Sequence, residues 1–399
     1  MTKTFIPKQQ IGVGGFKIGE AERRYLGEVI DSSRLSYGPM TERFEAEFAR
    51  LHDCRYAVFC NSGTSALHIA LAALKERGGW ADGDEVIVPA VTFVASSNIV
   101  LHNGMKPVFV DVERDTYNLD PTKIEAAITP RTRAILPVHL FGQPASMEGI
   151  WEVARKHNLV VFEDSAETMF ARYKEQSVGT LGDIGCFSTY VAHILVTGVG
   201  GFATTNDPEL AILLKSGMNH GRDSIYLNID DDKGKTGEQL FKVVERRFKF
   251  VRLGHSFRCT ELEAAIGLGQ LEQAEMFLAR RRTLAKRYTG GLSSLAERIQ
   301  LPRPREDRTH SYMMYPMVLR EESKWDLVRY LEERNIETRE MMPLVSQPVY
   351  RALFGDIEDQ YPVAKWINES GFYVGCHPYL ADEEVDYIIE QIHEYFRKR

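Results

Sequence analysis

The chain has 399 residues, of which 44% are hydrophobic and 26% charged, a composition typical of a globular protein with a large core. Its net charge of −7 and isoelectric point near 5.9 provide no surface-wide attraction for a polyanion, so we do not expect nucleic acid as a partner. The first residues contain no apolar leader, and no stretch reaches the roughly 18 apolar residues of a membrane span. We therefore expect a cytoplasmic protein without membrane contact. The five cysteines form no C-x-x-C pair, so neither a disulfide framework nor a metal site is predicted.

Short apolar runs alternate with longer helical patterns through the first half of the chain. The predicted strands are Tyr56–Cys60, Glu85–Pro89, Pro107–Asp111, Arg133–His139, Leu159–Asp164, Ile184–Tyr190 and Gly200–Thr205. The predicted helices are Thr64–Leu74, Val94–His102, Met147–His157 and Pro208–Met218. Because apolar strands without alternation are buried on both faces, this pattern predicts an α/β fold with a mostly parallel sheet between helices.

The second half of the chain changes character. Asp230–Gly237 is polar and contains glycine, which predicts a loop or insertion, and a long amphipathic helix is predicted over Glu261–Tyr288. Pro302 then interrupts the chain. The predicted elements beyond it are the strand-like run His310–Leu319 and the helices Lys324–Arg334 and Glu383–Arg397. We therefore expect a large α/β domain over residues 1–290 and a small α+β domain over residues 291–399.

Two of the predicted strands end in residues that suit a phosphorylated cofactor. Asn61-Ser-Gly-Thr-Ser-Ala66 follows a strand and opens a helix, where small residues let backbone N–H groups approach a phosphate. A generic strand-to-helix turn explains the same residues. Glu163-Asp164 ends a strand at the edge where ligands lie, and an aspartate there can keep a pyridine nitrogen protonated. An N-cap or loop aspartate is the alternative for that position.

A third motif joins these two in an order that resembles a known family. It runs from Phe187-Ser-Thr-Tyr190 to Gly198-Val-Gly-Gly201 and is followed by Asn219-His-Gly-Arg222. In this order the motifs resemble the DegT/DnrJ/EryC1/StrS sugar aminotransferases, and the similarity extends from Ser36-Tyr-Gly-Pro39 to Gly371–Pro378. The resemblance implies the type I fold of pyridoxal phosphate (PLP) transferases, with a seven-stranded sheet, a smaller C-terminal α+β domain and assembly as a homodimer.

The resemblance also implies which residues hold the ligands. The expected cofactor-binding residues are Ser62, Gly63, Thr64, Phe93, Asp164, Glu167, Ser188 and Ser256. Within this set, Phe93 should stack on the pyridine ring and Asp164 should pair with its nitrogen. Glu167 falls where the aminotransferases keep a glutamine, and an acidic residue there resembles the dehydratase branch of the family. The expected substrate-binding residues are His220, Arg222 and Arg339.

The chain departs from the family at the residue that normally binds the cofactor covalently. The lysine of the family falls on His193. An imidazole cannot form that covalent bond, but it can transfer protons near neutral pH. The same exchange occurs in the 4-keto-6-deoxy sugar nucleotide 3-dehydratases of this family. By resemblance, we expect His193 to be the catalytic base and acid, PLP or its aminated form (PMP) to bind non-covalently, a nucleotide-linked 4-keto sugar to be the substrate, and glutamate to regenerate PMP.

Two other interpretations stay open. The first is a nucleotide-sugar aminotransferase in which His193 or another base transfers the proton, with Lys215 and Lys242 as the nearest downstream lysines. The second is a ligand-binding homologue that has lost catalysis. Val199 and Ser256 fit neither branch well, because the family has a glutamate and an asparagine at these positions.

A further branch of the family carries a [2Fe–2S] cluster on four cysteines. The segment that would supply most of them, Ser224–Lys235, contains no cysteine. We therefore expect no iron–sulfur cluster.

Overall fold

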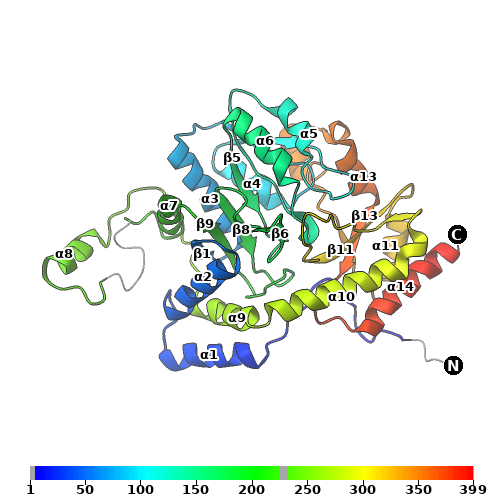
Figure 1. Ribbon diagram of the computed structural model, residues 1–399, viewed down its shortest axis with the longest axis horizontal. Coiled ribbons are helices and arrows are strands. Elements are labelled where there is room, and N and C mark those ends of the chain that lie inside the picture. Colours follow the sequence, from blue (N-terminus) through cyan, green and yellow to red (C-terminus); the bar gives the residue numbers. More distant parts are fainter. Residues whose placement is uncertain (1–4, 224–231, 399) are drawn as a thin grey trace.

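The computed structural model describes residues 5–223 and 232–398 (Figure 1). The predicted loop Asp230–Gly237 and the segment Ser224–Lys235 therefore lie partly outside the described residues. Figure 1 shows a large central sheet with helices packed around it and a second, smaller sheet close to the C-terminal helix. No helix in the described ranges has both the length and the apolar character required to cross a bilayer.

The large sheet has seven strands in the order β1-β9-β8-β5-β4-β2-β3. Its strands are β1 (Tyr56–Cys60), β2 (Glu85–Pro89), β3 (Lys106–Val110), β4 (Thr132–Ile135), β5 (Val160–Asp164), β8 (Ile184–Ser188) and β9 (Gly201–Thr205). The pairs from β3 to β8 are parallel, and β9 is antiparallel to both β8 and β1. The predicted mostly parallel seven-stranded sheet is thus confirmed. The carboxyl ends of its six parallel strands share one edge, where ligands bind in folds of this kind.

Strand β4 is shorter than predicted, because Arg133–His139 is not one continuous strand. The regular pairing stops at Ile135. Leu136 still donates a hydrogen bond to the Ile87 carbonyl. Pro137 has no N–H to donate but accepts a hydrogen bond from Asp164, and Val138 pairs with Asp164 only as an isolated bridge.

Helices cover the sheet and connect its strands. The helices of this region are α1 (Glu20–Ser32), α2 (Pro39–Leu51), α3 (Gly63–Gly78), α4 (Val94–His102), α5 (Pro121–Ile124), α6 (Met147–His157), α7 (Pro208–Met218), α8 (Gly237–Arg246) and α9 (Glu261–Leu271). Helices α4, α6 and α7 match the predicted ranges. In Figure 1, α1, α2 and α9 lie together beneath the sheet, while α8 extends away from the body. A two-stranded hairpin, β6 (Arg172–Tyr173) and β7 (Gln176–Ser177), precedes β8.

The prediction of one long helix over Glu261–Tyr288 is wrong in one respect, because the structure divides this segment into α9 and α10 (Ala274–Leu292). The break lies at Glu272 and Gln273. Both side chains bind α1: Glu272 accepts hydrogen bonds from Arg24 and Tyr25, and Gln273 donates to Glu22. These contacts to α1 accompany a change of direction that carries α10 towards the C-terminal part of the chain (Figure 1).

The C-terminal part is built on a four-stranded antiparallel sheet with its own apolar core. Its strands are β10 (Ile299–Gln300), β11 (Met314–Leu319), β12 (Arg339–Glu340) and β13 (Gly371–Gly375), and its helices are α11 (Trp325–Glu332), α12 (Pro348–Phe354), α13 (Pro362–Ser370) and α14 (Asp382–Arg397). This confirms the smaller α+β unit. Its core includes residues of α10 before position 290, such as Leu284 and Tyr288. The division into residues 1–290 and 291–399 stays a prediction.

Candidate functional site

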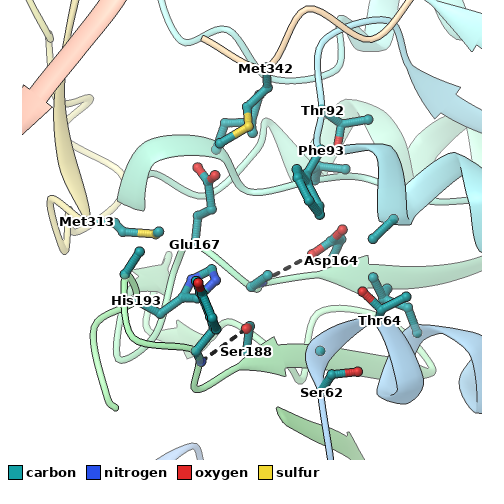
Figure 2. Close-up of a pocket in the computed structure, with 18 of the residues that line it drawn as sticks. Ser62, Thr64, Thr92, Phe93, Asp164, Glu167, Ser188, His193, Met313 and Met342 are labelled. Atoms are coloured by element: carbon teal, nitrogen blue, oxygen red, sulfur yellow. Dashed lines mark hydrogen bonds between the residues drawn. The ribbon is translucent and has the colours of Figure 1, made fainter. Parts of the chain in front are cut away.

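A cavity of about 430 Å³ opens at the carboxyl edge of the large sheet (Figure 2). Such a volume is within the range of small-molecule sites. Eight of the predicted site residues line it together: Ser62, Gly63, Thr64, Phe93, Asp164, Glu167, Ser188 and His193. They come from segments far apart in the chain and meet because β1, β2, β5 and β8 all end at this edge. The sequence therefore predicted most of the polar lining.

The N-terminus of α3 forms one end of the cavity. Ser62 caps the helix, since its Oγ accepts a hydrogen bond of 3.0 Å from the N–H of Ser65. A Cβ atom on Gly63 would lie 2.8 Å from the Cβ of Ser188 at the end of β8, so a glycine is required for this approach. The hydroxyl of Thr64 lies close by (Figure 2). The backbone N–H groups at the N-terminus of α3, together with the hydroxyls of Thr64 and Ser188, are suited to bind a phosphate.

Asp164 offers the cavity a buried carboxylate. Ser96 Oγ donates a hydrogen bond of 2.6 Å to its Oδ2, and the Ala166 N–H donates one of 3.1 Å to its Oδ1. Burial raises the pKa of Asp164, whereas these two donors lower it by stabilising the charged form. A protonated pyridine nitrogen placed here would be a positive partner for this carboxylate and would stabilise its charged form.

Phe93 lies beside Asp164 at the start of α4 (Figure 2). Its side chain is 57% exposed even though it lines the cavity. An exposed aromatic ring next to a carboxylate provides an apolar surface on which a second ring can stack.

Glu167 is a second buried carboxyl group of the lining. The N–H of Phe141 donates a hydrogen bond of 2.8 Å to its Oε2. Burial raises the pKa of Glu167 to about 7, and the negative charge of Asp164 acts in the same direction. Near neutral pH the group therefore has both protonated and charged forms available for proton transfer or hydrogen bonding.

His193 lies in the turn that follows β8, and its backbone N–H donates a hydrogen bond of 2.9 Å to the carbonyl of Tyr190. Its Nδ1 is shielded from solvent and has no hydrogen-bond partner among residues 5–223 and 232–398. Burial and the positive charge of Arg281 together lower the pKa of His193 to about 4, although a backbone hydrogen bond with Ala166 acts in the opposite direction. At neutral pH the imidazole is therefore uncharged and able to accept a proton. A shielded nitrogen without a partner is the kind of atom that a bound ligand would satisfy.

These groups fit the cofactor that the sequence resemblance implies. The helix terminus and its hydroxyls suit a phosphate, Asp164 suits a protonated ring nitrogen, and Phe93 suits the ring face. Among the described residues that line the cavity there is no lysine and no arginine. An amine able to bind the cofactor covalently is thus missing from this part of the described chain.

The other four predicted site residues lie outside the cavity lining. Ser256 and His220 are grouped around Arg258, whose Nη2 lies 3.2 Å from Ser256 Oγ and 3.3 Å from His220 Nε2. Arg222 packs its guanidinium over the rings of Phe248 and Phe250. Arg339 forms an ion pair with Glu337. Their predicted roles in cofactor and substrate binding stay predictions.

The structure adds lining residues that the sequence reasoning missed. Those from the C-terminal part are Met313, Met342 and Tyr373, and those close to the predicted motifs are Leu67, Thr92, Ala95, Val138, Leu140, Ala166, Tyr190, Ala192 and Gly200. In the first group, Tyr373 lies within the quoted segment Gly371–Pro378 and was accessible from the sequence, whereas no quoted motif marks Met313 or Met342. Tyr190 and Gly200 lie within a quoted motif and were accessible from the sequence.

Comparison with known proteins agrees with this geometry. The sequence model of the DegT/DnrJ/EryC1/StrS aminotransferase family matches residues 17–393. GDP-perosamine synthase of Caulobacter vibrioides is 36% identical over 385 residues, which cover 95% of this chain and 96% of that protein. A dTDP-4-dehydro-2,6-dideoxy-D-glucose 3-dehydratase of Saccharopolyspora spinosa is 33% identical and covers 96% of this chain and 86% of its own.

A solved structure is similar over the same length. The E. coli GDP-4-keto-6-deoxy-D-mannose-3-dehydratase with bound hydrated PLP matches with a TM-score of 0.84 and 25% identity. The match covers 96% of this chain and 99% of the other. Both dehydratases and the synthase are thus similar over nearly all of the fold that forms the cavity.

Proposed function

This chain belongs to the DegT/DnrJ/EryC1/StrS aminotransferase family, and on that premise we propose that it removes the C3 hydroxyl of a nucleotide-linked 4-keto-6-deoxy sugar. Proteins of this family include PLP-dependent enzymes that act on nucleotide sugars. The proposed cofactor is PMP, bound without a covalent link to the protein. Glutamate is proposed to regenerate it, and a homodimer is the proposed assembly.

One observation carries this proposal: His193, on which the lysine of the family falls by resemblance, lies in the cavity lining. His193 lines the cavity, and no lysine does so among the described residues. The site can therefore transfer protons, but it offers no amine to hold the cofactor covalently.

The residues of the cavity have separate tasks in this proposal. When bound, the cofactor would supply an amine for the sugar ketone and a ring that accepts electrons from a breaking C–H bond. Asp164 keeps the ring nitrogen protonated, and the α3 terminus binds the phosphate. His193 Nδ1 or Nε2 accepts the proton that is removed and, once charged, donates a proton to the departing hydroxyl. Buried Glu167 orients groups beside the ring through its hydrogen-bonding oxygens.

The test is a product analysis. The protein is incubated with PLP, glutamate and a nucleotide-linked 4-keto-6-deoxy hexose. We expect a 3-deoxy sugar, ammonia and 2-oxoglutarate, and we expect the His193→Asn variant to lose the 3-deoxy product. An amino sugar formed without release of ammonia would contradict the proposal.

The second candidate is an aminotransferase, favoured by the 36% identity to GDP-perosamine synthase. In this alternative His193 or another base transfers the proton, and Lys215 and Lys242 are the nearest downstream lysines. Lys215 Nζ lies 3.5 Å from Glu45 Oε2, and Lys242 Nζ lies 3.6 Å from Glu238 Oε1. Neither lysine lines the cavity in the described chain, which is why we favour the dehydratase. The same product analysis separates the two, because a transamination yields an amino sugar and no ammonia.

A further inference from the structure

Arg281 of α10 is a buried cation that contacts the backbone of two chain segments that line the cavity. Its Nη2 donates a hydrogen bond of 3.2 Å to the carbonyl oxygen of His193. Its Nη1 donates to three further carbonyl oxygens, those of Tyr312 at 3.1 Å, Met313 at 2.7 Å and Cys376 at 3.0 Å. Met313 lines the cavity on the same side as His193 (Figure 2). One guanidinium therefore joins the turn of His193 to the small sheet.

The surroundings of Arg281 are unusual for an arginine. The residue is 2% exposed, and within residues 5–223 and 232–398 no carboxylate forms an ion pair with it. Burying a charge without a counter-charge is costly, and hydrogen bonds to carbonyl oxygens offset only part of that cost. Burial lowers the pKa of Arg281 to about 10, which still leaves it charged at neutral pH. Its positive charge thus persists at the backbone of His193.

We propose that Arg281 is a positioning residue for His193, which fixes the turn that carries the imidazole and keeps the imidazole uncharged until it accepts a proton. This inference rests on the proposed proton-transfer role of His193. Arg281 contacts the backbone of residue 193 and is not among the described residues that line the cavity, so it acts through His193.

The groups around His193 act on its pKa in both directions. The ionisable side chains that share the lining with His193 are Asp164, Glu167, Tyr190 and Tyr373. Burial lowers the pKa of His193 most, a backbone hydrogen bond with Ala166 raises it, and the cation of Arg281 lowers it. Burial and Arg281 thus both favour the uncharged imidazole, the form that can act as a base. Its four hydrogen bonds hold the charge and the turn in one arrangement.

The first experiment measures His193 directly in the protein without cofactor or substrate. Histidine is labelled with 13C, the His193 resonance is assigned by its loss in His193→Asn, and its titration is followed by NMR. In Arg281→Met, which retains an apolar stem but no charge, we expect the pKa of His193 to rise by about 1. The matched control is Arg280→Met, because Arg280 lies on the same helix but donates to the Leu380 carbonyl and pairs with Asp382. An unchanged His193 titration in folded Arg281→Met would overturn the proposal.

If Arg281→Met does not fold, a second variant, Arg281→Lys, tests the proposal. Arg281→Lys keeps the charge but lacks the planar group that reaches both His193 and the small sheet. We expect His193 to stay uncharged at neutral pH, kcat to fall about tenfold because the imidazole is misplaced, and KM to change little. Arg280→Lys should retain the wild-type kcat. A wild-type kcat in Arg281→Lys would also overturn the proposal. An amino-sugar product would refute the dehydratase function while leaving the NMR result intact, so the two failures are distinguishable.

Discussion

The hydrogen bond from Ser96 to Asp164 makes a quantitative prediction about cofactor binding. Ser96 is fully buried, and its Oγ lies 2.6 Å from the Oδ2 of Asp164. Replacing it by alanine removes one of the two donors to this carboxylate. A hydrogen bond to a charged group contributes about 1.5–3 kcal/mol, which corresponds to roughly a 10- to 100-fold change in a binding constant. We therefore expect Ser96→Ala to raise the Kd of PMP by that factor.

The pH dependence of the Kd of PMP should change in a defined direction in Ser96→Ala. The pKa of Asp164 is already raised by burial, and loss of a donor to its charged form raises it further. Only the charged carboxylate pairs with a protonated ring nitrogen. The Kd of Ser96→Ala should therefore begin to increase at a higher pH than that of the wild type when the solution is acidified.

Equilibrium titration with PMP, followed by absorbance or by quenching of protein fluorescence, measures both effects. Ser97→Ala is the matched control, because Ser97 is the next residue of α4, is equally buried and makes no hydrogen bond to Asp164 in the described chain. An equal Kd for Ser96→Ala and wild type between pH 5 and 8 would refute the reasoning, as would an equal loss in Ser97→Ala.

Three further changes test other parts of the site and fold. His193→Lys should restore an amine to the cavity, so that PLP becomes attached in a form that borohydride fixes covalently, as mass spectrometry would show; no attachment in a folded variant would mean that residue 193 does not face the cofactor. Glu167→Gln removes a buried group whose pKa is raised to about 7. Because the folded protein holds this proton more tightly than the unfolded chain, wild-type stability should decrease by up to about 3 kcal/mol as pH rises from about 4.5 to 7, and the variant should lack this slope in urea unfolding. Glu261→Ala leaves the N–H groups of Gly38, Met40 and Thr41 at the start of α2 without their acceptor. We expect it to lower the free energy of unfolding by about 2–4 kcal/mol, and a loss below 1 kcal/mol would show that water replaces the carboxylate.

The large sheet and its cofactor edge were predictable because their signals are local. The strand Tyr56–Cys60 and the helices Val94–His102 and Pro208–Met218 have the predicted bounds, since each is a continuous apolar or periodic run. The small residues at Ser62–Thr64 follow a strand and precede a helix, so their place at the carboxyl edge follows from the parallel sheet.

The features that escaped prediction depend on contacts between distant segments. The break after Leu271 accompanies side-chain contacts with α1, about 250 residues earlier in the chain. Met313 and Met342 line the cavity from the C-terminal part of the chain, and no motif in their local sequence indicates this. Arg281 lies in a helix rich in arginine, and the sequence does not show which of these side chains points inward.

The two departures from the family pattern have different structural consequences. Val199 lines the cavity and is 50% exposed, so an apolar group contacts the ligand space where the family has a carboxylate. The valine at position 199 therefore changes which ligands the cavity can bind. Ser256 lies outside the lining, beside Arg258 and paired through its backbone with Asn219. A change there can affect the cavity of its own chain only indirectly. If the proposed homodimer places Ser256 against a second copy, its shorter side chain changes that copy's phosphate site instead. Consider a dimer of one wild-type and one variant chain. Val199→Glu should alter cofactor binding only at the cavity of the variant chain. Ser256→Asn should alter cofactor binding at the cavity of the wild-type partner.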